Sequence, residues 1–136
     1  MELTPQELEA YYSIIENKSD KEIQKYINIE MFRSETFGDS KLAKCIPRLT
    51  FGKAIPDHHQ SLPSRKLFEI CKKYAAKNST KIKTILQENR QKTNYALNII
   101  QLLAPAIAQQ YSGIPAMAIV GSITLLCRQG IDNFIK

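Results

Sequence analysis

The sequence predicts an all-α protein of about five helices, and three observations support this fold class. Two N-terminal segments begin with helix-capping residues and continue with apolar residues at helical spacing. A long block between Lys92 and Arg128 carries no charged residue. Five glycines and no tryptophan are few for an all-β sandwich or barrel. From its 136 residues we expect one domain with an N-terminal αα-hairpin, a long irregular loop and a C-terminal apolar helical hairpin as core.

Residues 1–33 predict an acidic helical hairpin. Thr4 to Glu7 form a capping box with proline at the first helical position, which predicts a helix over 5–17. Ser19 to Glu22 form a second capping box, which predicts a helix over 20–32. The expected apolar stripes consist of Leu8, Tyr11, Tyr12 and Ile15 on the first helix and Ile23, Tyr26, Ile27 and Met31 on the second.

Residues 34–63 lose the helical period, and their glycines and prolines predict an irregular loop or arm. The tripeptide Asp57-His58-His59 is chemically suggestive, because histidine is a common acid, base and metal ligand near neutral pH. Twelve residues separate Cys45 from His58 and eleven separate His59 from Cys71. Structural zinc sites pair ligands about two to five residues apart, so we expect no metal site and no thiol nucleophile here.

Residues 64–136 predict a basic helix followed by the apolar hairpin. A helix begins near Ser64 and buries one apolar face. A long helix over about 80–110 follows, either kinked at Pro105 or broken near Thr93-Asn94. A final helix over about 115–129 ends at Gly130, and one last apolar turn lies beyond it.

The sequence carries no catalytic motif. It has no phosphate-binding glycine loop, no GxGxxG, no HExxH and no pair of carboxylates on an apolar helix face. We therefore expect a protein that is not an enzyme and uses no cofactor and no small-molecule substrate. Three widely spaced cysteines and an N-terminus unlike a signal peptide predict a cytoplasmic protein.

The charge of the chain is strongly polarised. Residues 1–39 hold four Lys and Arg against nine Asp and Glu, whereas residues 40–95 hold thirteen against three. This layout predicts either pairing between the two regions or an anionic partner for the basic one. Nucleic-acid phosphates, an anionic membrane surface and plain solvation of a helix face are three interpretations of the segment 65–92. Its cations are Arg65, Lys66, Lys72, Lys73, Lys77, Lys81, Lys83, Arg90 and Lys92.

The charge-free block 96–127 admits three interpretations. A transmembrane helix needs about 20 consecutive apolar residues, and the block offers only fourteen, over 114–127. A membrane-inserting hairpin would place Arg90, Lys92 and Arg128 at one membrane face. A buried core hairpin is the third, and the few amphipathic helices elsewhere in the chain predict that another protein or a second copy completes its cover. The expected interface residues are Ile107, Ile114, Met117, Ile119, Val120, Gly121, Ile123 and Leu126.

These patterns lead to three functional hypotheses. The first is a non-enzymatic helical interaction or accessory module that self-associates or docks into a larger complex through the apolar hairpin. The second is a nucleic-acid-binding accessory protein that uses the basic segment 65–92. The third is a small membrane-active effector that inserts the 96–127 hairpin.

Overall fold

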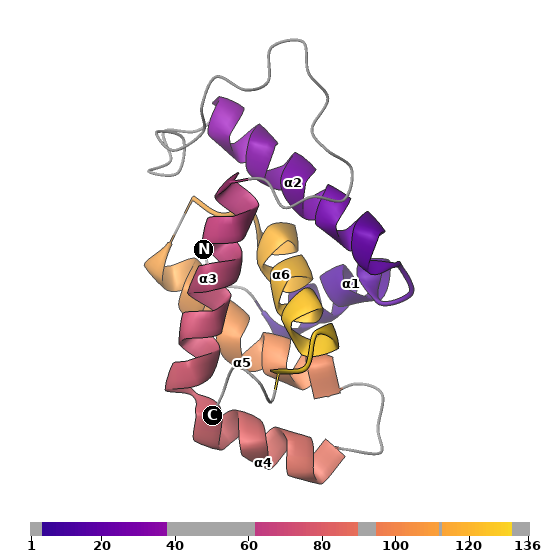
Figure 1. The fold of residues 1–136 in the computed structure, drawn as a ribbon, viewed down its shortest axis with the longest axis vertical. Coiled ribbons are helices and arrows are strands. Elements are labelled where there is room, and N and C mark those ends of the chain that lie inside the picture. The colour runs from indigo at the N-terminus through magenta and orange to yellow at the C-terminus, as the bar shows by residue number, and fades with distance from the viewer. Residues whose placement is uncertain (1–3, 38–61, 90–94, 112, 132–136) are drawn as a thin grey trace.

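The computed structural model describes residues 4–37, 62–89, 95–111 and 113–131. Regular structure in these ranges is helical, which confirms the all-α class, although six helices are present instead of about five (Figure 1). They are α1 (Pro5–Ile15), α2 (Asp20–Phe37), α3 (Leu62–Lys77), α4 (Ser79–Asn89), α5 (Tyr95–Gln110) and α6 (Ala116–Arg128).

The N-terminal hairpin begins as the capping residues predict. The Glu7 amide donates to Thr4 Oγ1 at 3.2 Å, and the Glu22 amide donates to Ser19 Oγ at 3.2 Å. The Ser19 amide donates back to Glu22 Oε1 at 3.5 Å, which closes the second capping box. Helix α2 then continues to Phe37, five residues beyond the expected end.

The long helix expected over 80–110 is two helices. Helix α4 ends at Asn89 and α5 begins at Tyr95, which agrees with the alternative of a break near Thr93-Asn94. The loop expected over 34–63 is shorter, since residues 34–37 belong to α2 and α3 begins at Leu62. The rest of that loop, with Cys45 and Asp57-His58-His59, lies outside the described residues, as do Arg90, Lys92 and residues 132–136.

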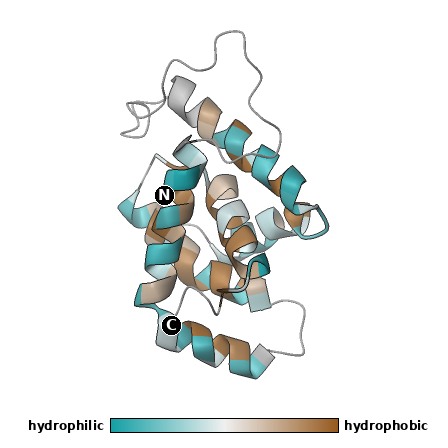
Figure 2. Cartoon of the chain, viewed as in Figure 1, coloured by the Kyte–Doolittle hydropathy of each residue, from teal (hydrophilic) through white to brown (hydrophobic). Residues whose placement is uncertain are grey.

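Helix α6 lies at the centre of the fold, and its own chain surrounds it. Ten consecutive residues from Ala118 to Cys127 are buried, so all sides of the helix are covered. Helices α1, α2, α3 and α5 contact α6, and α4 packs against α5 and α3 (Figure 1). Figure 2 shows brown, hydrophobic stretches along α5 and α6 and recurring teal, hydrophilic stretches along α2, α3 and α4. The sequence predicted that the other helices would leave part of the apolar hairpin uncovered. In the structure they bury the central helix of that hairpin on all sides.

Close approach of α2 to α6 depends on Gly121. A Cβ atom at this position would lie 2.9 Å from Ile27 Cγ1 and 3.4 Å from Ile23 Cγ2, which is less than ordinary contact for the first pair. Both isoleucines are buried against the central helix. The small residue therefore sets how closely two apolar helices pack.

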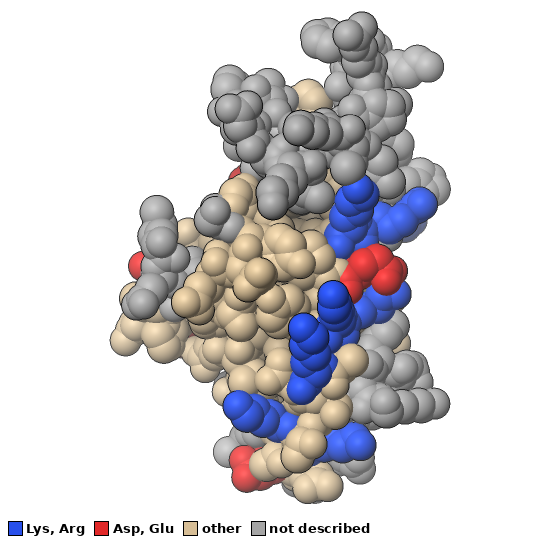
Figure 3. Space-filling model, turned by 90° about the vertical axis from the view of Figure 1, so that its left-hand side faces the viewer, with Lys and Arg blue, Asp and Glu red and all other residues tan. Residues whose placement is uncertain are grey.

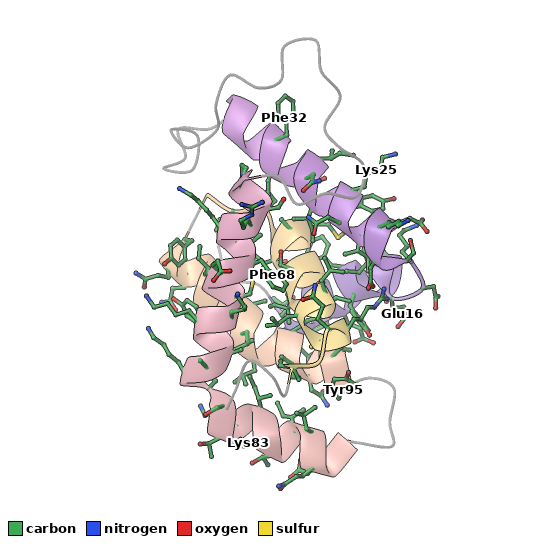
Figure 4. The ribbon with its side chains drawn as sticks, in the orientation of Figure 1. Glu16, Lys25, Phe32, Phe68, Lys83 and Tyr95 are labelled. Atoms are coloured by element: carbon green, nitrogen blue, oxygen red, sulfur yellow. The ribbon has the colours of Figure 1, made fainter. Side chains whose placement is uncertain are left out.

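Arg128 is the charged residue that ends the central helix, and it joins α6 to the N-terminal hairpin of α1 and α2. Its guanidinium donates from Nη2 to the Glu16 carbonyl at 2.8 Å and from Nη1 to the Lys18 carbonyl at 2.6 Å. Nη1 also lies 3.0 Å from Asp20 Oδ1. Figure 4 shows Glu16 at the turn between α1 and α2, close to the end of α6. One guanidinium thus satisfies carbonyls that the end of α1 leaves without helical partners.

Candidate functional site

Five cations lie on the side of α3 that faces away from the core. Leu67, Cys71 and Ala75 anchor the opposite side of the helix at 0% exposure. At about 100° per residue, the cations fall within roughly 140° of arc centred opposite these residues. Arg65, Lys73 and Lys77 are exposed, while Lys66 and Lys72 are half-buried. We call this surface the basic face, and it consists of Arg65, Lys66, Lys72, Lys73 and Lys77.

Contacts within α3 hold part of the basic face. Lys72 Nζ lies 2.7 Å from Glu69 Oε1 and 5.7 Å from the centre of the Phe68 ring. Lys77 Nζ lies 5.6 Å from the centre of the Tyr74 ring. Phe68 is 8% exposed and belongs to the core, so its ring links a surface lysine to the core (Figure 4). Glu69 is the one acidic residue of α3, and its described ion pair is with Lys72.

The remaining predicted cations divide into two groups. Lys81 and Lys83 are exposed on α4, but two residues of separation turn their side chains about 200° apart on the helix. Figure 4 places Lys83 on α4, at the opposite end of the molecule from α2. Arg90 and Lys92 lie outside the described residues. Among the seven described cations of the segment 65–92, the structure therefore brings together the five on α3.

The ion pairs described for the acidic hairpin and the basic face lie within α3 and between α2 and α6. Within the described ranges, the two ion pairs join Glu69 to Lys72 and Asp20 to Arg128. The first lies within α3 and the second joins α2 to α6. Both consequences of the polarised charge, pairing between the two regions and an anionic partner for the basic one, stay predictions.

The apolar residues expected at an interface lie mainly in the protein's own core. Ile107, Ile119 and Val120 are 0% exposed, and Ile114 and Met117 are half-buried. Because α1, α2, α3 and α5 already cover the central helix, these side chains contact the chain itself. The six expected interface residues that are buried are Ile107, Ile119, Val120, Gly121, Ile123 and Leu126.

An uncharged surface beside the basic face was missed by sequence reasoning. The second half of α5 and the link to α6 expose Ala106, Gln109 and Tyr111, with Pro105 half-buried among them. Figure 3 shows Lys and Arg side chains along one edge and a broad face without charges next to them. Figure 1 places α3, the end of α5 and the link on this side of the molecule. A signal existed: the small residues Pro105 and Ala106 lie between the buried Ala104 and Ile107, and the polar Gln109 follows two residues later.

The two described cysteines are buried thiols. Cys71 is 0% exposed and Cys127 is 3% exposed. Burial raises the pKa of Cys127 from 9.0 to about 12, and burial together with the neighbouring Cys127 raises the pKa of Cys71 still further. Both thiols therefore stay protonated at neutral pH, which disfavours them as nucleophiles or metal ligands.

Within the described ranges, His, Cys, Asp and Glu side chains nowhere gather in a group of three that could hold a metal ion. None of the described helices has the length and apolar character needed to cross a membrane. No protein-family model matches the chain, and neither the curated proteins nor the solved structures contain a significant match.

Proposed function

We propose that this protein is a non-enzymatic interaction module that binds an anionic partner through the basic face of α3. The observation that carries the proposal is the arrangement of cations on the outer side of a helix whose inner side is fixed in the core. Such a rigid support holds several positive charges close together, which concentrates the potential that attracts an anion.

Docking through the apolar hairpin itself is less consistent with this geometry. Ile119 and Val120 would have to leave the core before a partner could contact them. Removing side chains of this size from a core costs about 2–5 kcal/mol each when nothing replaces their contacts. The same cost opposes insertion of the 96–127 hairpin into a membrane. We therefore propose that the protein docks through the basic face of α3 and not through the apolar hairpin.

The nucleic-acid hypothesis is one form of this proposal. From Arg65 to Lys77 the basic face extends along α3 for about 18 Å, at 1.5 Å per residue. Duplex DNA carries one negative charge per roughly 1.7 Å of its axis, so this length spans on the order of ten phosphates. We expect the protein to bind random duplex DNA with an affinity that falls steeply as the salt concentration rises. Equal affinity at all salt concentrations would contradict this form of the proposal.

Retention on immobilised heparin tests the general proposal. Lys73→Glu on the basic face should elute at distinctly lower salt than the matched variant Lys21→Glu on α2, because both positions are exposed and both changes alter net charge equally. Equal shifts for the two variants would show that net charge alone governs retention, and the proposal would fail.

We also propose a cytoplasmic location. Its support is chemical: Cys71 and Cys127 are unpaired thiols packed in the core, as is common where the surroundings keep thiols reduced.

A further inference from the structure

We infer that the anionic partner is a phospholipid surface, which the basic face and the neighbouring uncharged face contact together. This inference rests on the proposed function and adds the class of partner. The uncharged face is defined by Pro105, Ala106, Gln109, Tyr111, Ile114 and Met117, all of which are exposed or half-buried.

The two faces adjoin on one side of the molecule. Figure 3 shows the row of Lys and Arg bordering a broad region without acidic side chains and without a deep groove. Helix α3 contacts both α5 and α6, so the helix that carries the cations also borders the helices that flank the link. No charged residue occurs anywhere between Lys92 and Arg128, which explains why the bordering region is free of charge.

The chemistry of the cations favours a diffuse array of anions. Four of the five cations of the basic face are lysines, whose ammonium groups are point charges on flexible stems. A specific acidic protein partner is typically bound by arginines, which make bidentate hydrogen bonds to carboxylates, and by a groove that receives its side chains. Lysines above a flat face suit phosphates that have no fixed register, as on a lipid surface or a nucleic acid.

The uncharged face distinguishes lipid from nucleic acid. Aliphatic side chains gain little beside a sugar–phosphate backbone, whereas at a bilayer they enter the boundary between headgroups and acyl chains. Tyr111, at 38% exposure, combines an apolar ring with a polar hydroxyl, as do the tyrosines that concentrate at membrane interfaces. Lysines that border such a surface strengthen binding about fivefold each through the anionic headgroups.

This mode of binding leaves the fold intact. Helix α6 stays in the core, and only side chains that are already at the surface contact the bilayer. The inference therefore differs from insertion of the apolar hairpin, which would require the central helix to leave its neighbours.

Cosedimentation of the full chain with vesicles tests the role of charge. Vesicles of phosphatidylcholine containing phosphatidylserine should bind the protein, and phosphatidylcholine alone should bind it far less. Lys73→Glu should weaken binding about tenfold, while the matched Lys21→Glu should change it little. Absence of binding to the phosphatidylserine vesicles at low salt would overturn the inference.

A second pair of variants tests the uncharged face. Ala106→Asp places a carboxylate among the apolar side chains at an exposed position, and Ala106→Asn places a neutral group of the same shape there. The aspartate variant should bind phosphatidylserine vesicles about tenfold more weakly than the asparagine variant. Equal binding by the two would overturn the inference, because the uncharged face would then not contact lipid.

Duplex DNA and heparin serve as comparison probes that separate the two claims. Charge-dependent binding to heparin or duplex without binding to vesicles would overturn the lipid inference and leave the proposed function standing. If Lys73→Glu behaves like Lys21→Glu with every probe, the proposed function fails together with the inference.

Discussion

At the scale of single residues, Arg128 has the largest set of long-range polar contacts described. It joins the end of α6 to two carbonyls and a carboxylate of the α1–α2 turn, more than one hundred positions earlier in the chain. From the sequence, Arg128 was one of three cations expected at a membrane face in the hairpin-insertion hypothesis. Its actual contacts could not be predicted, because they depend on where α6 ends relative to a turn that is distant in sequence.

Replacing Arg128 with lysine should lower the free energy of unfolding by about 1–2 kcal/mol, because an ammonium group cannot reproduce both arms of the guanidinium fork. Arg65→Lys is the matched control, since Arg65 is exposed on α3. Denaturant unfolding of both variants checks the expectation. Equal stabilities would mean that the contacts of Arg128 contribute nothing measurable.

The buried cysteines make stability depend on alkaline pH. In the unfolded chain a thiol loses its proton near its ordinary pKa of 9.0, whereas in the folded chain Cys127 keeps it until about pH 12. Above pH 9 the unfolded state therefore binds fewer protons, and the free energy of unfolding falls as pH rises. Each buried thiol contributes up to about 1.4 kcal/mol per pH unit.

Unfolding of the wild type and of Cys127→Ala at several pH values between 8 and roughly 11 measures this contribution. The variant should start from a lower stability, because it lacks a buried sulfur, and should then lose stability less steeply with pH. Parallel slopes for the two proteins would contradict the account of the buried thiol.

At the scale of elements, the contact between α2 and α6 depends on the small residue between them. Gly121→Val should destabilise the protein by about 1–3 kcal/mol, because its side chain would overlap Ile27. Ile27→Ala removes the overlapping atoms, so Gly121→Val should cost less in that background. A double-mutant cycle with no coupling would show that the helices adjust without strain.

The helix starts of α1 and α2 could be predicted because capping is local chemistry within four residues. Which side chains of α2 are buried was harder to predict from the sequence. Tyr26 was expected in the apolar stripe but is 38% exposed, with Lys18 Nζ 5.4 Å from its ring. Asn28, by contrast, is 1% exposed, and its side chain accepts hydrogen bonds from Gln24 and Ser64. A buried amide side chain needs hydrogen-bond partners that tertiary structure brings to it. The spacing of apolar residues in the sequence does not predict those partners.

At the scale of the whole molecule, the main revision concerns the cover of the apolar block. The sequence predicted the hairpin as the core, but counting amphipathic helices underestimated how much of α6 they bury. Five of the nine predicted cations form one surface, and this arrangement on α3 follows from helical spacing alone. The uncharged face was missed because the exposed Ala106 is as small and apolar as the buried Ala104, so that Gln109 was the one clear polar signal on this face of α5.

A chain that covers its own central helix needs no second copy to do so. We therefore expect a monomer in light scattering at high protein concentration and moderate salt, without lipid or another polyanion. A stable dimer under these conditions would instead support the self-association hypothesis and would direct attention to the half-buried Ile114 and Met117.

The central claim, that the basic face of α3 binds an anionic partner, is tested most directly by hydrogen exchange with and without heparin. We expect heparin to slow exchange in peptides that cover Leu62–Lys77 and to leave Pro5–Ile15 unchanged. Protection confined to α1 and α2, or no protection in any helix despite saturating heparin, would contradict the account.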